Sequence, residues 1–192
     1  MITTVLLDLD DTILDFHKAE KEALKKALQK VGVEPTEKLL ARYSEINQAQ
    51  WKKLELGELT QEEVKISRYH IFFEKYGITA SPEETAKCYE QNLAYEHEKV
   101  DGALELLQEL HGKYRLYAAS NGTYEVQRRR IEESGIKPYF EDFFISKKSG
   151  IINRTKNFST IVLHIFLILS WKRVSLWATA YPQISLVEKM PD

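Results

Sequence analysis

Three carboxylates stand within four residues at the end of the first apolar run of the chain. Asp8, Asp10 and Asp11 follow a run of β-branched and leucine residues that begins at Ile2. Such a run predicts a buried strand, and ligands of open α/β sheets bind beyond the carboxyl ends of the strands. Clustered acids repel one another unless a cation lies between them, and Mg2+ prefers oxygen ligands. These acids therefore predict a magnesium site beside a substrate; the alternative is a solvated acidic turn that caps the next helix.

A second polar cluster follows a later strand, which we expect over residues 114–119. Three small or polar residues come directly after it: Ser120, Asn121 and Gly122. A helix is predicted over residues 123–134, and helices between strands indicate right-handed crossovers and a parallel sheet. We therefore expect Ser120 at the same end of the sheet as Asp8, on an adjacent strand.

The two strands are separated by a long stretch with helical periodicity and no strand pattern. Residues 16–95 predict four helices, with a capping box at Thr60–Glu63 before the third. Their aromatic residues form the core of this insertion or line a pocket: Trp51, Tyr69, Phe72 and Phe73. We expect a helical insertion over 16–95 in a discontinuous α/β core made of residues 1–15 and 96–150.

Composition excludes several classes of protein. The 192 residues are 43% hydrophobic and carry a net charge of −2, which favours neither nucleic acid nor an acidic membrane as a partner. The only cysteine, Cys88, cannot form an intramolecular disulfide, and no signal peptide opens the chain, so we expect a cytoplasmic protein. The five histidines show no common metal-ligand spacing, and Arg128–Arg130 are expected on a solvated helix face.

The pattern Asp8-x-Asp10-x-Thr12 after the first strand, with Ser-Asn-Gly-Thr at 120–123 after a later one, resembles the haloacid dehalogenase (HAD) superfamily. The sequence over 8–16 is similar to that of YjjG-type pyrimidine 5'-nucleotidases. The resemblance extends from residue 1 to about residue 150. It implies an α/β fold with a HAD-like Rossmannoid parallel sheet, incomplete here, and an inserted α-helical cap.

The resemblance also implies an activity: a Mg2+-dependent phosphomonoester hydrolase acting on pyrimidine nucleoside monophosphates. Asp8 would be the nucleophile that forms an aspartyl-phosphate, and Asp10 would be the general acid and then the general base. Mg2+ would bind the Asp8 carboxylate and the Asp10 carbonyl oxygen, while Ser120, Asn121 and Gly122 would hold phosphate oxygens. An acid at position 10 favours a phosphatase over a dehalogenase. A phosphoglycolate-type or sugar-phosphate phosphatase, and an inactive remnant, stay as alternatives.

Residues 151–192 depart from the family pattern. The Lys-Pro expected shortly after Ile145 and a later Gly-Asp-Ser are missing, and this segment holds two of the 29 acidic residues but five of the 27 basic ones. Codon junctions in the second reading frame permit both motifs, in order: Lys-Pro-Asp from Ile152, and Gly-Asp-Ser from Trp177, whose single codon forces the glycine. We therefore hypothesise a frameshifted and truncated ending, an aberrant tail foreign to the fold; the alternative is a genuine, divergent C-terminal segment. We expect the aberrant tail to impair activity and stability and to leave exposed apolar surface or an open sheet edge.

Overall fold

The computed structural model describes residues 4–145 and 184–185. The chain divides into two compact units, one formed by Met1–Phe16 and His97–Asp192, the other by His17–Glu96. The expected aberrant tail over 151–192 lies outside the described residues, except for Ile184–Ser185. No helix in the described ranges is long and apolar enough to cross a membrane.

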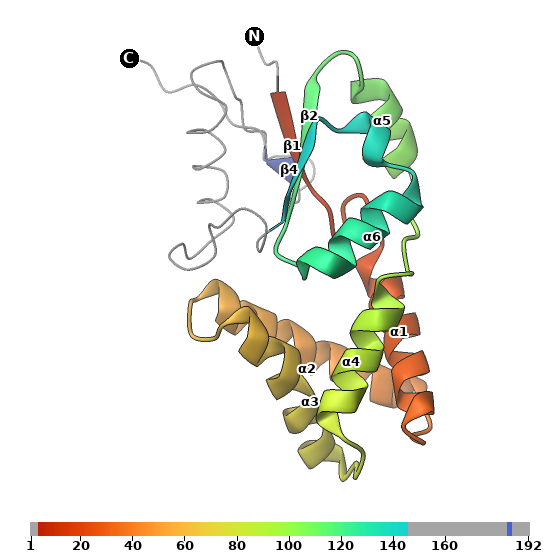
Figure 1. The fold of residues 1–192 in the computed structure, drawn as a ribbon, viewed down its shortest axis with the longest axis vertical. Coiled ribbons are helices and arrows are strands. Elements are labelled where there is room, and N and C mark those ends of the chain that lie inside the picture. The colour runs from red at the N-terminus through yellow and green to blue at the C-terminus, as the bar shows by residue number, and fades with distance from the viewer. Residues whose placement is uncertain (1–3, 146–183, 186–192) are drawn as a thin grey trace. The chain divides into compact units, whose positions relative to one another are not determined.

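The first unit is built on a sheet with the strand order β3-β2-β1-β4. Figure 1 labels β1, β2 and β4 of this sheet. Strands β1 (Thr4–Asp8), β2 (Arg115–Ser120) and β3 (Asp142–Ile145) run parallel. In the β1–β2 register, Asp8 lies opposite Ala119, one residue before Ser120. The predicted α/β class is therefore confirmed, and so is the prediction that Asp8 and Ser120 share one end of the sheet.

The other edge of β1 is partly paired. Strand β4 (Ile184–Ser185) runs antiparallel to β1, with Ile184 opposite Leu7 and Ser185 opposite Leu6. The predicted open edge is wrong for these two positions, because a short piece of the expected foreign tail supplies backbone partners there.

Helices cover the sheet and bury its apolar residues. Helices α5 (Ala103–Leu110) and α6 (Tyr124–Ser134) lie on the same side of the strands in Figure 1, and the short 3-10 helix η1 (Lys137–Tyr139) follows. Helix α6 ends at Gly135, whose φ of 73° is a left-handed conformation that favours glycine. The core between strands and helices has one contiguous set of buried side chains, including Leu7, Leu107 and Ile131.

The second unit consists of helices α1 (Phe16–Lys30), α2 (Glu37–Glu55), α3 (Gln61–Tyr76) and α4 (Pro82–Leu93). Local sequence signals explain where α3 and α4 begin. The predicted capping box is present, since Thr60 Oγ1 accepts from the Glu63 N–H while the Glu63 carboxylate accepts from the Thr60 N–H. Ser81 caps α4 in front of a proline at the first helical position.

The interior of the helical unit combines aromatic packing with a buried polar network. The aromatic residues were predicted either to form the core of this unit or to line a pocket. Tyr69, Phe72 and Phe73 are buried in the core. Beside them, Asn47 donates to Glu20 Oε1 at 2.5 Å and accepts from Arg68 Nη1 at 2.8 Å. Both charged groups are buried, so Asn47 links an acid and a base that water cannot solvate.

Candidate active site

Asp8 ends β1, and the chain turns sharply after it. The Asp8 carboxylate accepts the N–H of Leu9 at 2.8 Å, and Leu9 continues the pairing to β2 through the carbonyl oxygen of Ala119 at 3.1 Å. The Leu9 carbonyl then accepts the N–H groups of Ile13 and Leu14, which closes a compact loop. Buried apolar side chains at 9, 13 and 14 anchor this loop in the core. Its acids are therefore held at the carboxyl end of the sheet.

The acids of this loop have different backbone conformations and different hydrogen-bond partners. Asp11 adopts a φ of 56°, the only left-handed non-glycine residue among those described, and its carboxylate accepts the N–H of Phe16 at 2.9 Å. Asp11 thereby caps the start of α1, which is the role that the alternative interpretation gave to the whole acidic cluster. Asp10 has a different environment, and its side chain is 26% exposed.

Asp10 lies against the end of β2 and the first turns of α6. The Ser120 hydroxyl donates to its Oδ2 at 3.2 Å, and Gln127 Nε2 donates to the same oxygen at 2.5 Å. Arg130 Nη1 lies 2.5 Å from Oδ1. Both carboxylate oxygens of Asp10 therefore receive donors, one of them a full positive charge, which makes these bonds stronger than neutral ones.

Ser120, Asn121 and Gly122 form the turn between β2 and α6. Ser120 is 2% exposed. Its hydroxyl accepts hydrogen bonds from the Gly122 N–H at 3.0 Å and from Gln127 Nε2 at 2.7 Å. Asn121 is half-buried in this turn. The structure thus brings Asp10, Ser120 and Gly122 together, and it places Asp8 on the neighbouring strand beside Ala119.

Two residues of this cluster were missed in the sequence. Arg130 was expected on a solvated face, but it is 0% exposed, whereas its neighbour Arg128 has a side chain that is 49% exposed and pairs with Glu132. Gln127 is also buried. Positions 127 and 130 face the core together with Val126 and Ile131, so the helical spacing of the apolar residues was the signal that could have found them.

The described donors can supply part of a magnesium site. Asp8 and the Asp10 main-chain carbonyl offer the hard oxygen atoms that Mg2+ prefers. No group of three ligating side chains occurs among residues 4–145, and the Asp10 carboxylate is engaged by Gln127 and Arg130. The donor chemistry of the Asp8 carboxylate and the Asp10 carbonyl fits a hard divalent ion.

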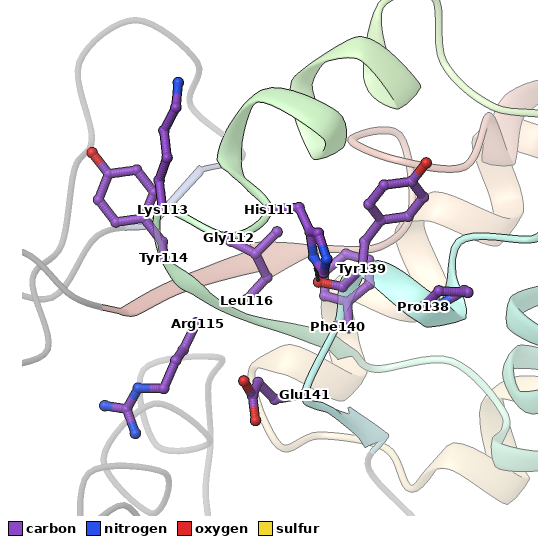
Figure 2. A pocket seen from close by; sticks show the side chains of 10 residues that line it. All are labelled: His111, Gly112, Lys113, Tyr114, Arg115, Leu116, Pro138, Tyr139, Phe140 and Glu141. Carbon is purple, nitrogen blue, oxygen red and sulfur yellow. Dashed lines mark hydrogen bonds between the residues drawn. The ribbon is translucent and has the colours of Figure 1, made fainter.

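A cavity of about 510 Å3 lies elsewhere, at the opposite end of β2. It is lined by residues 111–116 and 138–141, none of which belongs to the site at Ser120. Figure 2 shows the rings of His111 and Tyr139 together, while the charged ends of Lys113 and Arg115 point away from them in different directions. Because these cations do not converge, the cavity lacks the grouped donors of an anion site.

The chain matches known proteins over most of its length. The family model of the haloacid dehalogenase-like hydrolases matches residues 2–164. The HAD-hydrolase YfnB of Bacillus subtilis is 34% identical over 159 residues, which are 83% of this chain and 68% of YfnB. The pyrimidine 5'-nucleotidase PynA of Streptococcus pneumoniae is 37% identical over 145 residues, 75% of this chain and 61% of PynA. The chain thus spans 61–68% of the length of these two relatives.

Solved structures agree with this relationship. A crystal structure of YfnB, described as bound to magnesium, superposes with a TM-score of 0.74 at 35% identity, covering 78% of this chain and 67% of that one. L-2-haloacid dehalogenase from Xanthobacter autotrophicus has a TM-score of 0.65 at 14% identity, over 90% of this chain and 66% of its own, and so shares the fold. From its strand order, its loop acids and these matches, the chain belongs to the haloacid dehalogenase-like hydrolases.

Proposed function

We propose that this chain is a Mg2+-dependent phosphomonoester hydrolase whose substrates are pyrimidine nucleoside 5'-monophosphates. The observation that carries the proposal is the placement of Asp8 and Asp10 at the carboxyl end of β1, with the Asp10 carboxylate 3.2 Å from the Ser120 hydroxyl. A nucleophile, a proton carrier and an anion-binding hydroxyl are the groups that phosphoryl transfer through an enzyme carboxylate requires.

The first step would form a bond between the Asp8 carboxylate and phosphorus and break the bond to the sugar oxygen. Asp10, carrying a proton, would donate it to the departing oxygen, so that an alcohol leaves in place of an alkoxide. Asp10 would then accept a proton from the water that attacks the aspartyl-phosphate, releasing phosphate and regenerating Asp8. The Ser120 hydroxyl and the N–H groups of Asn121 and Gly122 would hold phosphate oxygens through both steps.

Asp8 and the Asp10 carbonyl would hold the metal. When bound, Mg2+ would neutralise part of the negative charge on the transferring group. Its use is supported by the description of YfnB as bound to magnesium. The free, buried Cys88 is compatible with the reducing cytoplasm in which we propose that the protein works.

The choice of a nucleotide as substrate is supported by the names of two relatives. PynA and YjjG of Escherichia coli are both named pyrimidine 5'-nucleotidases, the latter at 22% identity over 79% of this chain and 66% of its own. The helical unit over residues 17–96 would act as the cap that shapes the leaving-group pocket. Phosphoglycolate-type and sugar-phosphate phosphatases would use the same core residues with a different cap surface.

A phosphate-release assay with Mg2+ tests the proposal. We expect the purified chain to hydrolyse dUMP and dTMP faster than phosphoglycolate or hexose phosphates, and Asp8→Asn to abolish hydrolysis of all of them. Activity confined to phosphoglycolate or sugar phosphates would show that the chain is a phosphatase of that class and not a nucleotidase. Absence of phosphate release from every ester would identify an inactive remnant.

A further inference from the structure

Arg130 is a buried cation in a run of three arginines. Its side chain is 1% exposed, whereas those of Arg128 and Arg129 are 49% and 42% exposed and pair with glutamates on their own helix. The Arg130 guanidinium also lies 5.9 Å from the centre of the Phe16 ring. Burial of a cation is costly unless it is paired and hydrogen-bonded, so its partners indicate why it is there.

The partner of Arg130 is the proposed proton carrier. Arg130 Nη1 contacts Asp10 Oδ1 at 2.5 Å and donates to Gln127 Oε1 at 2.9 Å. Gln127 in turn donates through Nε2 to Asp10 Oδ2 at 2.5 Å and to Ser120 Oγ at 2.7 Å. Gln127 and Arg130, three residues apart on α6, therefore bind both carboxylate oxygens of Asp10. Gln127 also donates to the Ser120 hydroxyl, which is expected to bind phosphate.

These contacts hold the Asp10 side chain, which lies in a loop and is not fixed by regular secondary structure. Asp10 lies beyond the end of β1, in a loop, and its carboxylate is part-exposed. Arg130 and Gln127 come from an 11-residue helix whose Ile131 belongs to the same buried core as the side chains of β1 and β2. A catalytic group held by a rigid element keeps its geometry, and a misplacement of about 1 Å can cost about a hundredfold in rate.

We propose that Arg130 and Gln127 are positioning residues that orient the Asp10 carboxylate for proton transfer to and from the reacting oxygens. This inference rests on the proposed phosphatase function and names the residues that make its acid–base group effective. In this role both residues act through Asp10, and Gln127 acts also through Ser120.

The leaving group of the substrate gives a readout that a purely structural role would not move. An alkoxide leaving from dUMP needs a proton, whereas p-nitrophenolate leaves as a stable anion. For Arg130→Met and Gln127→Leu we expect kcat/KM for dUMP to fall about tenfold to a hundredfold, and that for p-nitrophenyl phosphate to fall at least fivefold less. The loss should be in kcat, with KM changed less than threefold. Arg128→Met, on the same helix but exposed, is the matched control.

A double-mutant cycle tests the contact without turnover. We expect Asp10→Asn and Arg130→Met to change the unfolding constant in urea non-additively, with a coupling factor of at least fivefold, while Asp10→Asn and Arg128→Met combine additively.

The two results separate this inference from the proposed function. Equal losses for both esters, a gain of activity in Arg130→Met, or an additive cycle would each overturn the positioning role. A wild-type chain that cleaves neither ester would count against the proposed function, and a coupled cycle would then still support the orientation of Asp10 by Arg130.

Discussion

Gly122 and Gln127 approach each other so closely that no side chain fits between them. A Cβ atom on Gly122 would lie 2.7 Å from Nε2 and 2.8 Å from Cγ of Gln127, closer than real Cβ atoms come. Since Cγ is near the base of the side chain, Gln127 could not make room by moving its amide alone. Glycine at 122 therefore permits the contact between Gln127 and Asp10.

The first prediction follows from this contact. Gly122→Ala should displace Gln127 from Asp10 and lower kcat/KM for dUMP about tenfold. The check is non-additivity: Gly122→Ala added to Gln127→Ala should cost no more than Gln127→Ala alone. Additive losses would mean that the alanine acts directly on the phosphate site.

The second prediction concerns the metal. At ten times its Kd, Mg2+ should stabilise the folded chain by about 1.4 kcal/mol, which for a chain of this size raises Tm by roughly 3–5 °C. Asp8→Asn should remove this shift, because Asp8 supplies the carboxylate that we propose binds the ion. Asp142→Asn, an exposed acid at the start of β3, should keep it. Scanning calorimetry with and without Mg2+ makes the comparison, and an undiminished shift in Asp8→Asn would place the ion elsewhere.

The third prediction concerns pH. Burial raises the pKa of Glu20 above its ordinary value of 4.5, although hydrogen bonds from Ser44 and Asn47 offset part of the rise. The folded state thus holds this proton more tightly than the unfolded state does. The contribution of Glu20 to stability is therefore fully present below pH 4.5 and is lost as the pH rises through the folded-state pKa. Urea midpoints of wild type and Glu20→Gln should diverge over this range, with the variant the less sensitive to rising pH; parallel curves would contradict this.

The fourth prediction concerns the bridge between two buried charges. Asn47→Leu removes the hydrogen bonds that join Glu20 to Arg68 and leaves both charges buried without this link. We expect a loss of about 3 kcal/mol in the free energy of unfolding. Gln50→Leu is the control, because Gln50 is also buried on α2 but, within the described part of the chain, its side chain accepts a single long hydrogen bond, from Ser67 at 3.4 Å. A loss no larger than that of the control would show that the bridge contributes little.

The fifth prediction concerns the hypothesis of a shifted frame. Replacing residues from 151 onward with the product of the second frame adds the Lys-Pro and Gly-Asp-Ser motifs. We expect hydrolysis of dUMP to rise at least a hundredfold, the order of effect that one group stabilising transition-state charge typically has. Codons that fail to encode these motifs in the second frame would end the hypothesis before any assay.

The sequence by itself determined the strand before Asp8, the strand before Ser120 and the end of the sheet at which the acids lie, whereas it did not predict β4. The apolar run before Asp8 and the helix between Ser120 and residue 142 leave few ways to fold, because crossovers between parallel strands are right-handed. The sequence also predicted hydrogen bonds between residues that are close in the chain, as in the Thr60–Glu63 capping box.

Only the tertiary structure decided what surrounds Asp10. The contact of Arg130 with Asp10 spans 120 positions in the chain, and no local pattern encodes a pairing at that separation. A run of three arginines is ordinarily solvated because burying a cation costs free energy. Arg130 is the exception because helical spacing turns it toward the sheet, where a carboxylate at the end of another strand compensates its charge.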